Sequence, residues 1–302
     1  MSTNFKFLGT DESFPALVVS GIMGMKQTGK SLYSFEQGYA LIKQEGNGGI
    51  LYLGTEEVTD VMFTQGNDGN PSWRERLDKK YGISPKYEYI FLPNVEEFLK
   101  FFGINGRLVI KPGRVDEKNP EKTKGMTLDY DVINMTLENT PLEKKLKEGF
   151  TYIVIDSMTA MFDSLAISGN QNFPKRHQAE EIFFLQLNQL LYKLKQYNVR
   201  VFTTHHITFN PTDSFAAKMN EKMLVAKGGK AIWHYTKMLY GLKAYMRPHG
   251  ARQMVVVRYP NLPEYGKEYT LLIDGTGIAR ADAKQLERIK GEQKEDLAAQ
   301  RA

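Results

Sequence analysis

Residues 24–31 read Gly24-Met25-Lys26-Gln27-Thr28-Gly29-Lys30-Ser31. This stretch fits the pattern G-x-x-x-x-G-K-S/T of a phosphate-binding loop, or P-loop. Its glycines let the backbone curl so that successive N–H groups point at phosphate oxygens. Lys30 is expected to reach the β- and γ-phosphates of a nucleotide, and the Ser31 hydroxyl is expected to hold Mg²⁺. We therefore predict a nucleotide site made of this loop and Leu32.

The sequence on both sides of the loop agrees with this prediction. Residues 16–21 are apolar and partly β-branched, which indicates a buried strand. Residues 32–43 predict a helix, because apolar side chains recur there at helical spacing. A strand, a glycine loop and a helix N-terminus together place the helix dipole beneath the phosphates. A chance glycine-rich turn would not require such flanks.

Composition limits the class of protein. The chain has 302 residues, of which 41% are hydrophobic, enough for the core of one large α/β domain or two small ones. It has no cysteine, which excludes disulfides and thiolate metal sites and suits an intracellular, cytoplasmic protein. No apolar run approaches the ~18 residues of a membrane span, so we expect no membrane partner. The net charge of +5 permits a nucleic-acid partner without requiring one.

Strand and helix patterns alternate along the chain. Strands are expected at 49–54, 89–92, 152–157, 199–204, 238–245, 253–259 and 269–273. Helices are expected at 73–81, 95–102, 141–148 and 179–196. This alternation predicts an α/β fold with a mostly parallel central sheet, helices on both faces, and antiparallel strands at the C-terminal side.

The same patterns suggest how the chain is divided. No internal repeat and no second domain is evident. We expect a polar lead-in at 1–15, a core domain at 16–280 and a charged tail or exposed helix at 281–302. Residues 105–140 break the strand–helix alternation and include a Pro-, Gly- and charge-rich stretch, so we predict an insertion there.

Three carboxylates follow predicted strands. Asp156 ends a hydrophobic strand, where a carboxylate lies beside a P-loop and can hold Mg²⁺ through its water shell. Glu56 and Glu57 end the strand that follows the first helix. Either can polarise the water that attacks the γ-phosphate, and we slightly favour Glu57. The alternative for this pair is a solvated acidic turn.

Two histidines close the strand at 199–204. His206, with His205 beside it, is a candidate catalytic sensor that detects the γ-phosphate and relays its loss to the next loop. The alternative is a pair of histidines held by hydrogen bonds near a strand end. A zinc site is disfavoured, because no cluster of other ligands accompanies them.

Two polar loops combine aromatic rings with cations. The candidate contacts in the loop at 207–227 are Phe209, Phe215, Lys218, Lys222 and Lys227. Those in the loop at 168–176 are Phe173, Lys175 and Arg176. Rings stack on bases and cations neutralise phosphates, so single-stranded DNA is the expected partner. The alternative is a pair of flexible surface loops.

The order of these parts resembles the RecA/RadA recombinase core and its KaiC-like relatives, from about residue 17 to 278. Residues 153–160 are similar to that family's Walker B strand, and residues 172–178 stand where RadA-type proteins have their first DNA-binding loop. Residues 201–206 resemble the strand that ends in Asn-Gln in RadA, although His-His, which also occurs in some RepA-like helicases, stands here instead. Residues 227–234 resemble a Gly-Gly helix start, and residues 259–264 resemble the Pro-x-Leu-Pro-Glu stretch that caps a neighbouring subunit's nucleotide.

The resemblance implies a RecA-like P-loop ATPase core at 16–280. It implies ATP and Mg²⁺ as cofactors, a head-to-tail homo-oligomer (filament or ring) with ATP between subunits, and DNA-stimulated, recombinase-like action on single-stranded DNA. Pro260 would cap the neighbour's nucleotide, and Arg258 would reach the neighbour's phosphates or would be an ordinary surface arginine.

The resemblance leaves other points open. In this family an aromatic residue near the N-terminus docks into an adjacent subunit, so Phe5 or Phe14 either does so or is a core residue. Two alternative functions also remain: a hexameric helicase or translocase motor, and a KaiC-like regulatory ATPase without DNA dependence.

Overall fold

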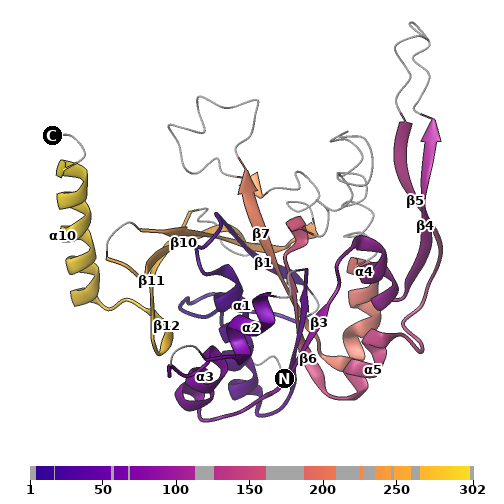
Figure 1. The fold of residues 1–302 in the computed structure, drawn as a ribbon, viewed down its shortest axis with the longest axis horizontal. Coiled ribbons are helices and arrows are strands. Elements are labelled where there is room, and N and C mark those ends of the chain that lie inside the picture. Colours follow the sequence, from indigo (N-terminus) through magenta and orange to yellow (C-terminus); the bar gives the residue numbers. More distant parts are fainter. Residues whose placement is uncertain are drawn as a thin grey trace, which may run out of the picture.

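A ten-stranded sheet forms the centre of the protein (Figure 1). This computed structural model describes residues 5–16, 18–55, 58–66, 69–112, 126–160, 187–208, 225–226, 235–245, 248–259 and 266–299. The strand order is β12-β11-β10-β9-β1-β7-β6-β2-β3, and β8 pairs with β7 beside this path.

The sheet has a parallel half and an antiparallel half. The parallel strands are β1 (Val19–Gly24), β2 (Gly49–Gly54), β3 (Lys86–Phe91), β6 (Phe150–Asp156), β7 (Arg200–Thr208) and β9 (Met238–Ala244). The antiparallel strands are β8 (Val225–Ala226), β10 (Ala251–Arg258), β11 (Glu268–Asp274) and β12 (Gly277–Arg280). This confirms the predicted α/β fold with antiparallel strands at the C-terminal side. The carboxyl ends of β1, β7, β6 and β2 consequently meet along one edge.

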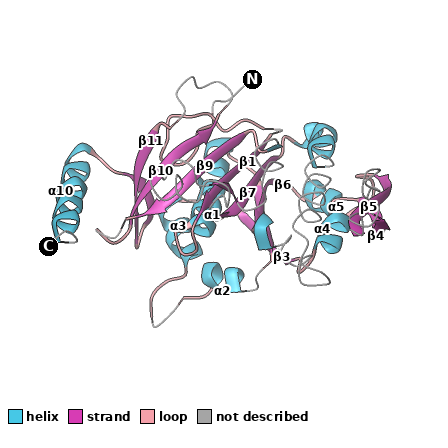
Figure 2. Ribbon diagram, turned by 90° about the horizontal axis from the view of Figure 1, so that it is seen from above, coloured by secondary structure: helices cyan, strands magenta, loops and turns pink. Residues whose placement is uncertain are grey.

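Helices flank this sheet along its length (Figure 2). They are α1 (Lys30–Glu45), α2 (Val58–Thr64), α3 (Trp73–Tyr81), α4 (Val95–Phe101), α5 (Pro141–Lys147), a helical stretch at 187–193 that continues into the 3-10 turn η2 (Leu194–Tyr197), and α10 (Ala283–Ala299). In the described part of the chain, no helix combines the length and the apolar character that crossing a membrane requires.

The central strands are apolar on both faces because both faces are covered. In β2, Leu51 and Leu53 join one core cluster, whereas Ile50 and Tyr52 join the other. The first cluster includes the buried leucines of 187–194, and the second includes the apolar side chains of α1. Alternate residues of a strand point to opposite faces, so a continuous apolar run is the pattern expected for a doubly covered sheet.

Side-chain caps set the starts of the short helices. The Ser72 hydroxyl accepts a hydrogen bond from the Glu75 backbone N–H at 3.2 Å, and the Glu75 carboxylate accepts one from Ser72, which completes a capping box for α3. Thr140 caps α5 in the same way, with a proline at the first helical position. These local signals explain why both helices begin where the sequence predicts.

The stretch predicted as an insertion contains a separate two-stranded sheet. β4 (Ile104–Pro112) and β5 (Met126–Met135) pair with each other and with no other strand described here. In Figure 1 this β4–β5 ribbon extends away from the body. The sequence indicated only a break in the strand–helix alternation here, and these two long paired strands were not predicted.

Several element boundaries differ from the prediction. β1 begins at Val19 and runs to Gly24, because its pairing with both β7 and β9 continues through that residue. β7 runs to Thr208, because β8 pairs with its last residues. His205 and His206 therefore lie within a strand, and the predicted loop does not begin at Ile207. The sequence analysis also missed α2, β5, β8 and β12, which are short or paired with distant segments.

The N-terminal segment packs onto its own subunit. Lys6 and Ser13 form a β-bridge, and the Phe14 ring lies 4.5 Å from that of Phe7, between centroids. Phe5 and Phe14 are 5% and 1% exposed, and the buried Arg200 donates to the Phe14 carbonyl oxygen at 3.2 Å. Of the two alternatives for these aromatic residues, the structure supports a place in the core and not in an adjacent subunit.

This packing predicts the effect of Phe14→Ala. The change should lower the free energy of unfolding by about 3–5 kcal/mol, because it empties a fully buried aromatic site. The measurement is denaturant unfolding at several protein concentrations. As a control, Tyr192→Ala removes an aromatic side chain that is 80% exposed and should change stability by less than about 0.5 kcal/mol. A loss for Phe14→Ala that appears only at concentrations where subunits associate would contradict packing within one subunit.

Candidate nucleotide-binding site

The phosphate loop connects β1 to α1 and is a tight turn. β1 ends at Gly24, and α1 begins at Lys30 directly after Gly29, whose φ of 96° lies in the left-handed region that favours glycine. A Cβ on Gly24 would lie 2.4 Å from the Leu242 carbonyl oxygen, so no larger residue fits there. The shape of the loop therefore depends on both glycines of the motif.

The Lys30 ammonium group lies inside this loop. It donates to the carbonyl oxygens of Gly24 at 3.0 Å and Met25 at 2.6 Å, and the residue is only 6% exposed. Thr28 is also buried and donates to the Met25 carbonyl at 3.0 Å, whereas Met25, Lys26 and Gln27 are exposed. The loop thus presents a buried cation next to a helix N-terminus, an arrangement that attracts anions.

Arg252 is a neighbour of the loop that the sequence analysis missed. It lies near the start of β10, and its Nε donates to the Thr28 carbonyl oxygen at 2.7 Å. Burial lowers the pKa of this guanidinium. Its partner is a backbone carbonyl 224 residues away, so no sequence pattern marks the pair.

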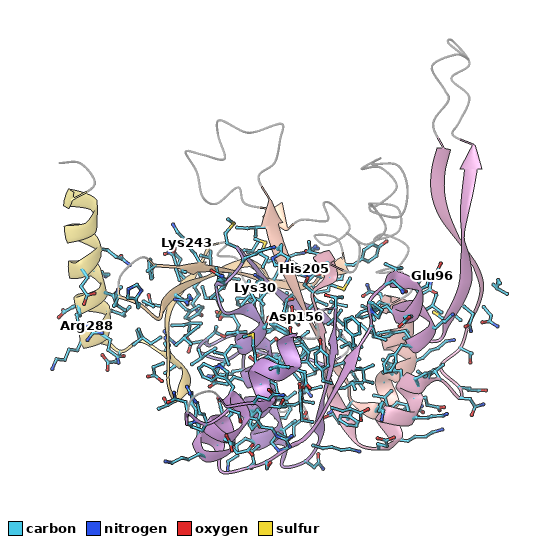
Figure 3. The ribbon with its side chains drawn as sticks, viewed as in Figure 1. Lys30, Glu96, Asp156, His205, Lys243 and Arg288 are labelled. Carbon is cyan, nitrogen blue, oxygen red and sulfur yellow. The ribbon has the colours of Figure 1, made fainter. Side chains whose placement is uncertain are left out.

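Asp156 stands at the carboxyl end of β6, opposite Gly54 of β2. Its carboxylate accepts hydrogen bonds from two hydroxyls on the flanking strands. Tyr52 donates to Oδ2 at 2.5 Å, and Thr204 donates to Oδ1. Figure 3 shows Asp156 in the same region of the molecule as Lys30. The residue is 8% exposed, so Asp156 is almost fully buried at this edge of the sheet.

Ser31 and Asp156 fit the predicted magnesium site. A hydroxyl and a carboxylate are the hard oxygen donors that Mg²⁺ prefers. Tyr52 lies between them: its hydroxyl oxygen is 3.2 Å from the Ser34 hydroxyl, which donates to the Ser31 carbonyl at 2.8 Å. Burial raises the pKa of Tyr52 well above its ordinary value, and Asp156 raises it further, while Ser34 and Ser31 oppose this rise.

The two histidines occupy opposite faces of β7. His206 pairs in register with Gly24 and shares a face with Thr204, the side toward Asp156; its backbone N–H donates to the Thr159 hydroxyl at 2.9 Å. His205 is fully buried on the other face, 2.8 Å from the Thr203 hydroxyl. Burial lowers the pKa of His205 to about 3, so this ring is neutral at pH 7. His206 is therefore the member of the pair that shares a face with the Thr204 hydroxyl, which contacts Asp156.

Arg258 lies level with Gly21 of β1, not with Gly24 at the start of the phosphate loop, and is two strands away from β1. It ends β10 and pairs with Leu239, at the amino end of β9, whereas Gly24 pairs with Leu242 near the carboxyl end of that strand. The other predicted site residues lie outside the described part of the chain: Glu56, Glu57, Phe173, Lys175, Arg176, Phe209, Phe215, Lys218, Lys222, Lys227 and Pro260.

Tyr52 and Thr204 were not predicted as site residues, although strand alternation could have indicated both. Both are polar positions near the ends of core strands. Strand alternation places Thr204 two residues before His206, on the same face, and Tyr52 two residues before Gly54. The missing information was which strands are neighbours, since both hydroxyls reach Asp156 only because β6 lies between β2 and β7.

Comparisons with known proteins agree with this geometry. The crystal structure of the RadB recombinase aligns with a TM-score of 0.52 at 17% sequence identity, covering 90% of this chain and 94% of that chain. No curated relative matches the chain. A family model named Rad51 matches residues 128–280, which take in Asp156, both histidines and Arg258 and make up just over half of the 302 residues. The fold is thus RecA-like, and the protein belongs to the Rad51 family of ATPases.

Proposed function

We propose that this protein is a recombinase-like ATPase that binds Mg²⁺–ATP at residues 24–32, assembles head to tail with ATP between subunits, and binds single-stranded DNA. The observation that carries the proposal is that the phosphate loop follows β1 and Asp156 ends β6, with only β7 between these two strands, in a Rad51-family fold. This arrangement brings a cation for phosphates and oxygens for Mg²⁺ to one edge of the sheet.

Each group at this edge has a task in phosphoryl transfer. The N–H groups of the loop and the Lys30 ammonium would bind the phosphate oxygens and stabilise the charge that develops in the transition state. Ser31 and Asp156 would hold Mg²⁺, which neutralises phosphate charge when bound. The buried setting supports this role, because electrostatic interactions are stronger where water is excluded.

The general base would come from the end of β2. Thr55 directly follows that strand, and its backbone N–H donates to the Asp156 carbonyl oxygen at 2.9 Å. Glu56 and Glu57 are the next two residues, so this acidic pair follows directly after a residue that is hydrogen-bonded to Asp156. A carboxylate there would orient and deprotonate the attacking water.

The position of Arg258 supports a role in a neighbouring subunit. The residue lies level with Gly21 of β1 and two strands away from it, on the side away from its own phosphate loop. Head-to-tail stacking places one end of a subunit against the other end of the next. Arg258, with Pro260 beside it, would then approach the neighbour's phosphates.

The placement of the second polar loop supports DNA binding coupled to nucleotide. β8 pairs with the last two residues of β7, so both ends of the segment 209–224 are held just beyond His206. A change at the phosphate sensor would therefore be transmitted directly to the base of this loop. Its aromatic rings and lysines suit single strands with little sequence discrimination.

The hydrolysis mechanism predicts the effect of Glu57→Gln. Nucleotide binding should be retained, and turnover should fall by about 100-fold or more, because the attacking water loses its base. The measurement is steady-state ATPase activity beside nucleotide affinity. Lys30→Ala, in contrast, should abolish turnover because the phosphates lose their main cation. A normal rate for Glu57→Gln with a loss for Glu56→Gln would transfer the role to Glu56, and normal rates for both would remove the pair from the mechanism.

The assembly model predicts the effect of Arg258→Ala. Oligomers should still form with ATP, but turnover should fall by roughly 100-fold, because one charge-stabilising donor is lost. Arg288→Ala, a change of an exposed arginine on α10, is the matched control and should keep the full rate.

Mixing subunits tests whether Arg258 acts across the interface. A mixture of Arg258→Ala subunits, which are slow, and Lys30→Ala subunits, which are inactive, should be more active than either variant alone. In the mixture, an intact phosphate loop can face an intact arginine from the neighbour. Absence of any recovery, or full activity of a strict monomer at nanomolar concentration, would refute the model.

The DNA model predicts the effect of replacing Lys218 and Lys222 together with Ala. Binding of single-stranded DNA in the presence of ATP should weaken, and its salt dependence should flatten by roughly one unit per lost phosphate contact. Basal ATPase activity should survive. The measurement is titration of a labelled oligonucleotide at several salt concentrations, with Lys284 and Lys290 of α10 replaced together with Ala as the control. No binding by the wild type at low salt would instead favour a regulatory ATPase, and duplex unwinding would favour a motor.

A further inference from the structure

Tyr52 places one hydroxyl in an otherwise apolar, aromatic part of the core. The residue is 0% exposed, and its ring packs against those of Phe63 and Tyr89, with centroids 5.2 Å and 5.8 Å away. A buried hydroxyl is costly unless it is hydrogen-bonded, and here it donates to Asp156 Oδ2. The ring is thus held by packing, and the hydroxyl is held at a fixed point beside the carboxylate.

The carboxylate of Asp156 is fixed from two sides. An aspartate side chain is free to rotate broadly about its last torsion angle. Here Tyr52 binds one oxygen and Thr204 binds the other, from the strands on either side of β6. Each carboxylate oxygen keeps a second lone pair. The two hydroxyls therefore define the direction in which the remaining lone pairs point.

Tyr52 also connects this carboxylate to the helix that carries Ser31. The Ser34 hydroxyl lies 3.2 Å from the Tyr52 oxygen and donates to the Ser31 carbonyl at 2.8 Å. Ser34 and Tyr52 are both fully buried, so water does not compete for these contacts. A hydroxyl has one proton, so Ser34 donates either to the Ser31 carbonyl or to the Tyr52 oxygen; in both cases its buried hydroxyl lies between Tyr52 and the start of α1.

We propose that Tyr52 is a positioning residue for the magnesium site: its hydroxyl orients the Asp156 carboxylate toward the Mg²⁺ water shell, beside the helix that carries Ser31. This inference rests on the proposed function, since it concerns the same nucleotide site. Tyr52 does not itself touch nucleotide or metal in this role. It acts through Asp156, as partners of metal-binding side chains commonly do.

The test is Tyr52→Phe, which removes one oxygen and keeps the ring in place. The Mg²⁺ concentration that half-saturates binding of a fluorescent ADP should rise about 10-fold, as for other losses of a partner behind a metal ligand. At saturating Mg²⁺ the ADP affinity should be unchanged within about 2-fold, because the phosphate loop is intact. This readout needs no turnover.

Tyr152→Phe is the matched control. Tyr152 is also 0% exposed and on the neighbouring strand, but its hydroxyl donates to the Ser34 carbonyl at 2.9 Å and does not contact Asp156. Both variants lose one buried hydrogen bond, so their melting temperatures should fall by similar amounts. The Mg²⁺ requirement should rise for Tyr52→Phe alone.

Two further variants test whether the effect passes through Asp156. Thr204→Val removes the second hydroxyl donor and should also raise the Mg²⁺ requirement, and it decides the question if Tyr52→Phe does not fold. In an Asp156→Asn background, adding Tyr52→Phe should change the Mg²⁺ requirement by less than about 2-fold, because coupled residues are not additive.

The outcomes separate the two proposals. If the wild type binds ADP without any dependence on Mg²⁺, or does not bind it, the proposed function fails. If the wild type depends on Mg²⁺ but Tyr52→Phe behaves like Tyr152→Phe, the positioning role is overturned and the proposed function stands. Full additivity with Asp156→Asn would likewise overturn the positioning role.

Discussion

The hydrogen-bonded position of β1 between β7 and β9 is the constraint on which the nucleotide site depends. Gly24 is in register with His206 on one side and Leu242 on the other. A parallel strand with partners on both sides cannot shift by one residue without turning every side chain to the opposite face. The phosphate loop therefore starts level with His206 of β7, and β7 is the one strand between it and β6, which ends in Asp156.

Two pairs of charged residues hold α1 in place against the sheet and its neighbours. Glu36 on α1 is fully buried, and it accepts hydrogen bonds from Lys80 at 2.6 Å and from the Ile278 backbone N–H at 2.8 Å. Arg200 at the start of β7 pairs with Glu45 at the end of α1. An unpaired charge at such depth would be strongly unfavourable, so these pairs specify which elements meet more than they add stability. Together they hold α1, and with it Lys30 and Ser31, against the sheet.

The parts of the site that follow from local sequence were predictable. The P-loop was predictable because its glycines and Lys30 lie within a few residues of one another. Asp156 was predictable because it ends an apolar run. Tyr52, Thr204 and Arg252 were not. Their roles depend on which strands lie side by side, and that order is set by packing across the whole chain. The histidine pair shows the same limit, since only the contact of Thr204 with Asp156 reveals which face of β7 is turned toward that carboxylate.

The contacts of Glu36 and Glu12 also bear on how the chain is made. Glu36 needs the backbone of Ile278, and Glu12 binds the hydroxyl of Tyr269, so two early carboxylates depend on the last strands of the sheet. A chain emerging from the ribosome exposes α1 long before either partner has been synthesised. Before β11 and β12 are made, Glu36 has Lys80 as a partner but lacks the Ile278 N–H, and Glu12 lacks the Tyr269 hydroxyl, so burying either acid is less favourable. These contacts of the nucleotide-binding half are therefore completed only after residue 278 has been synthesised.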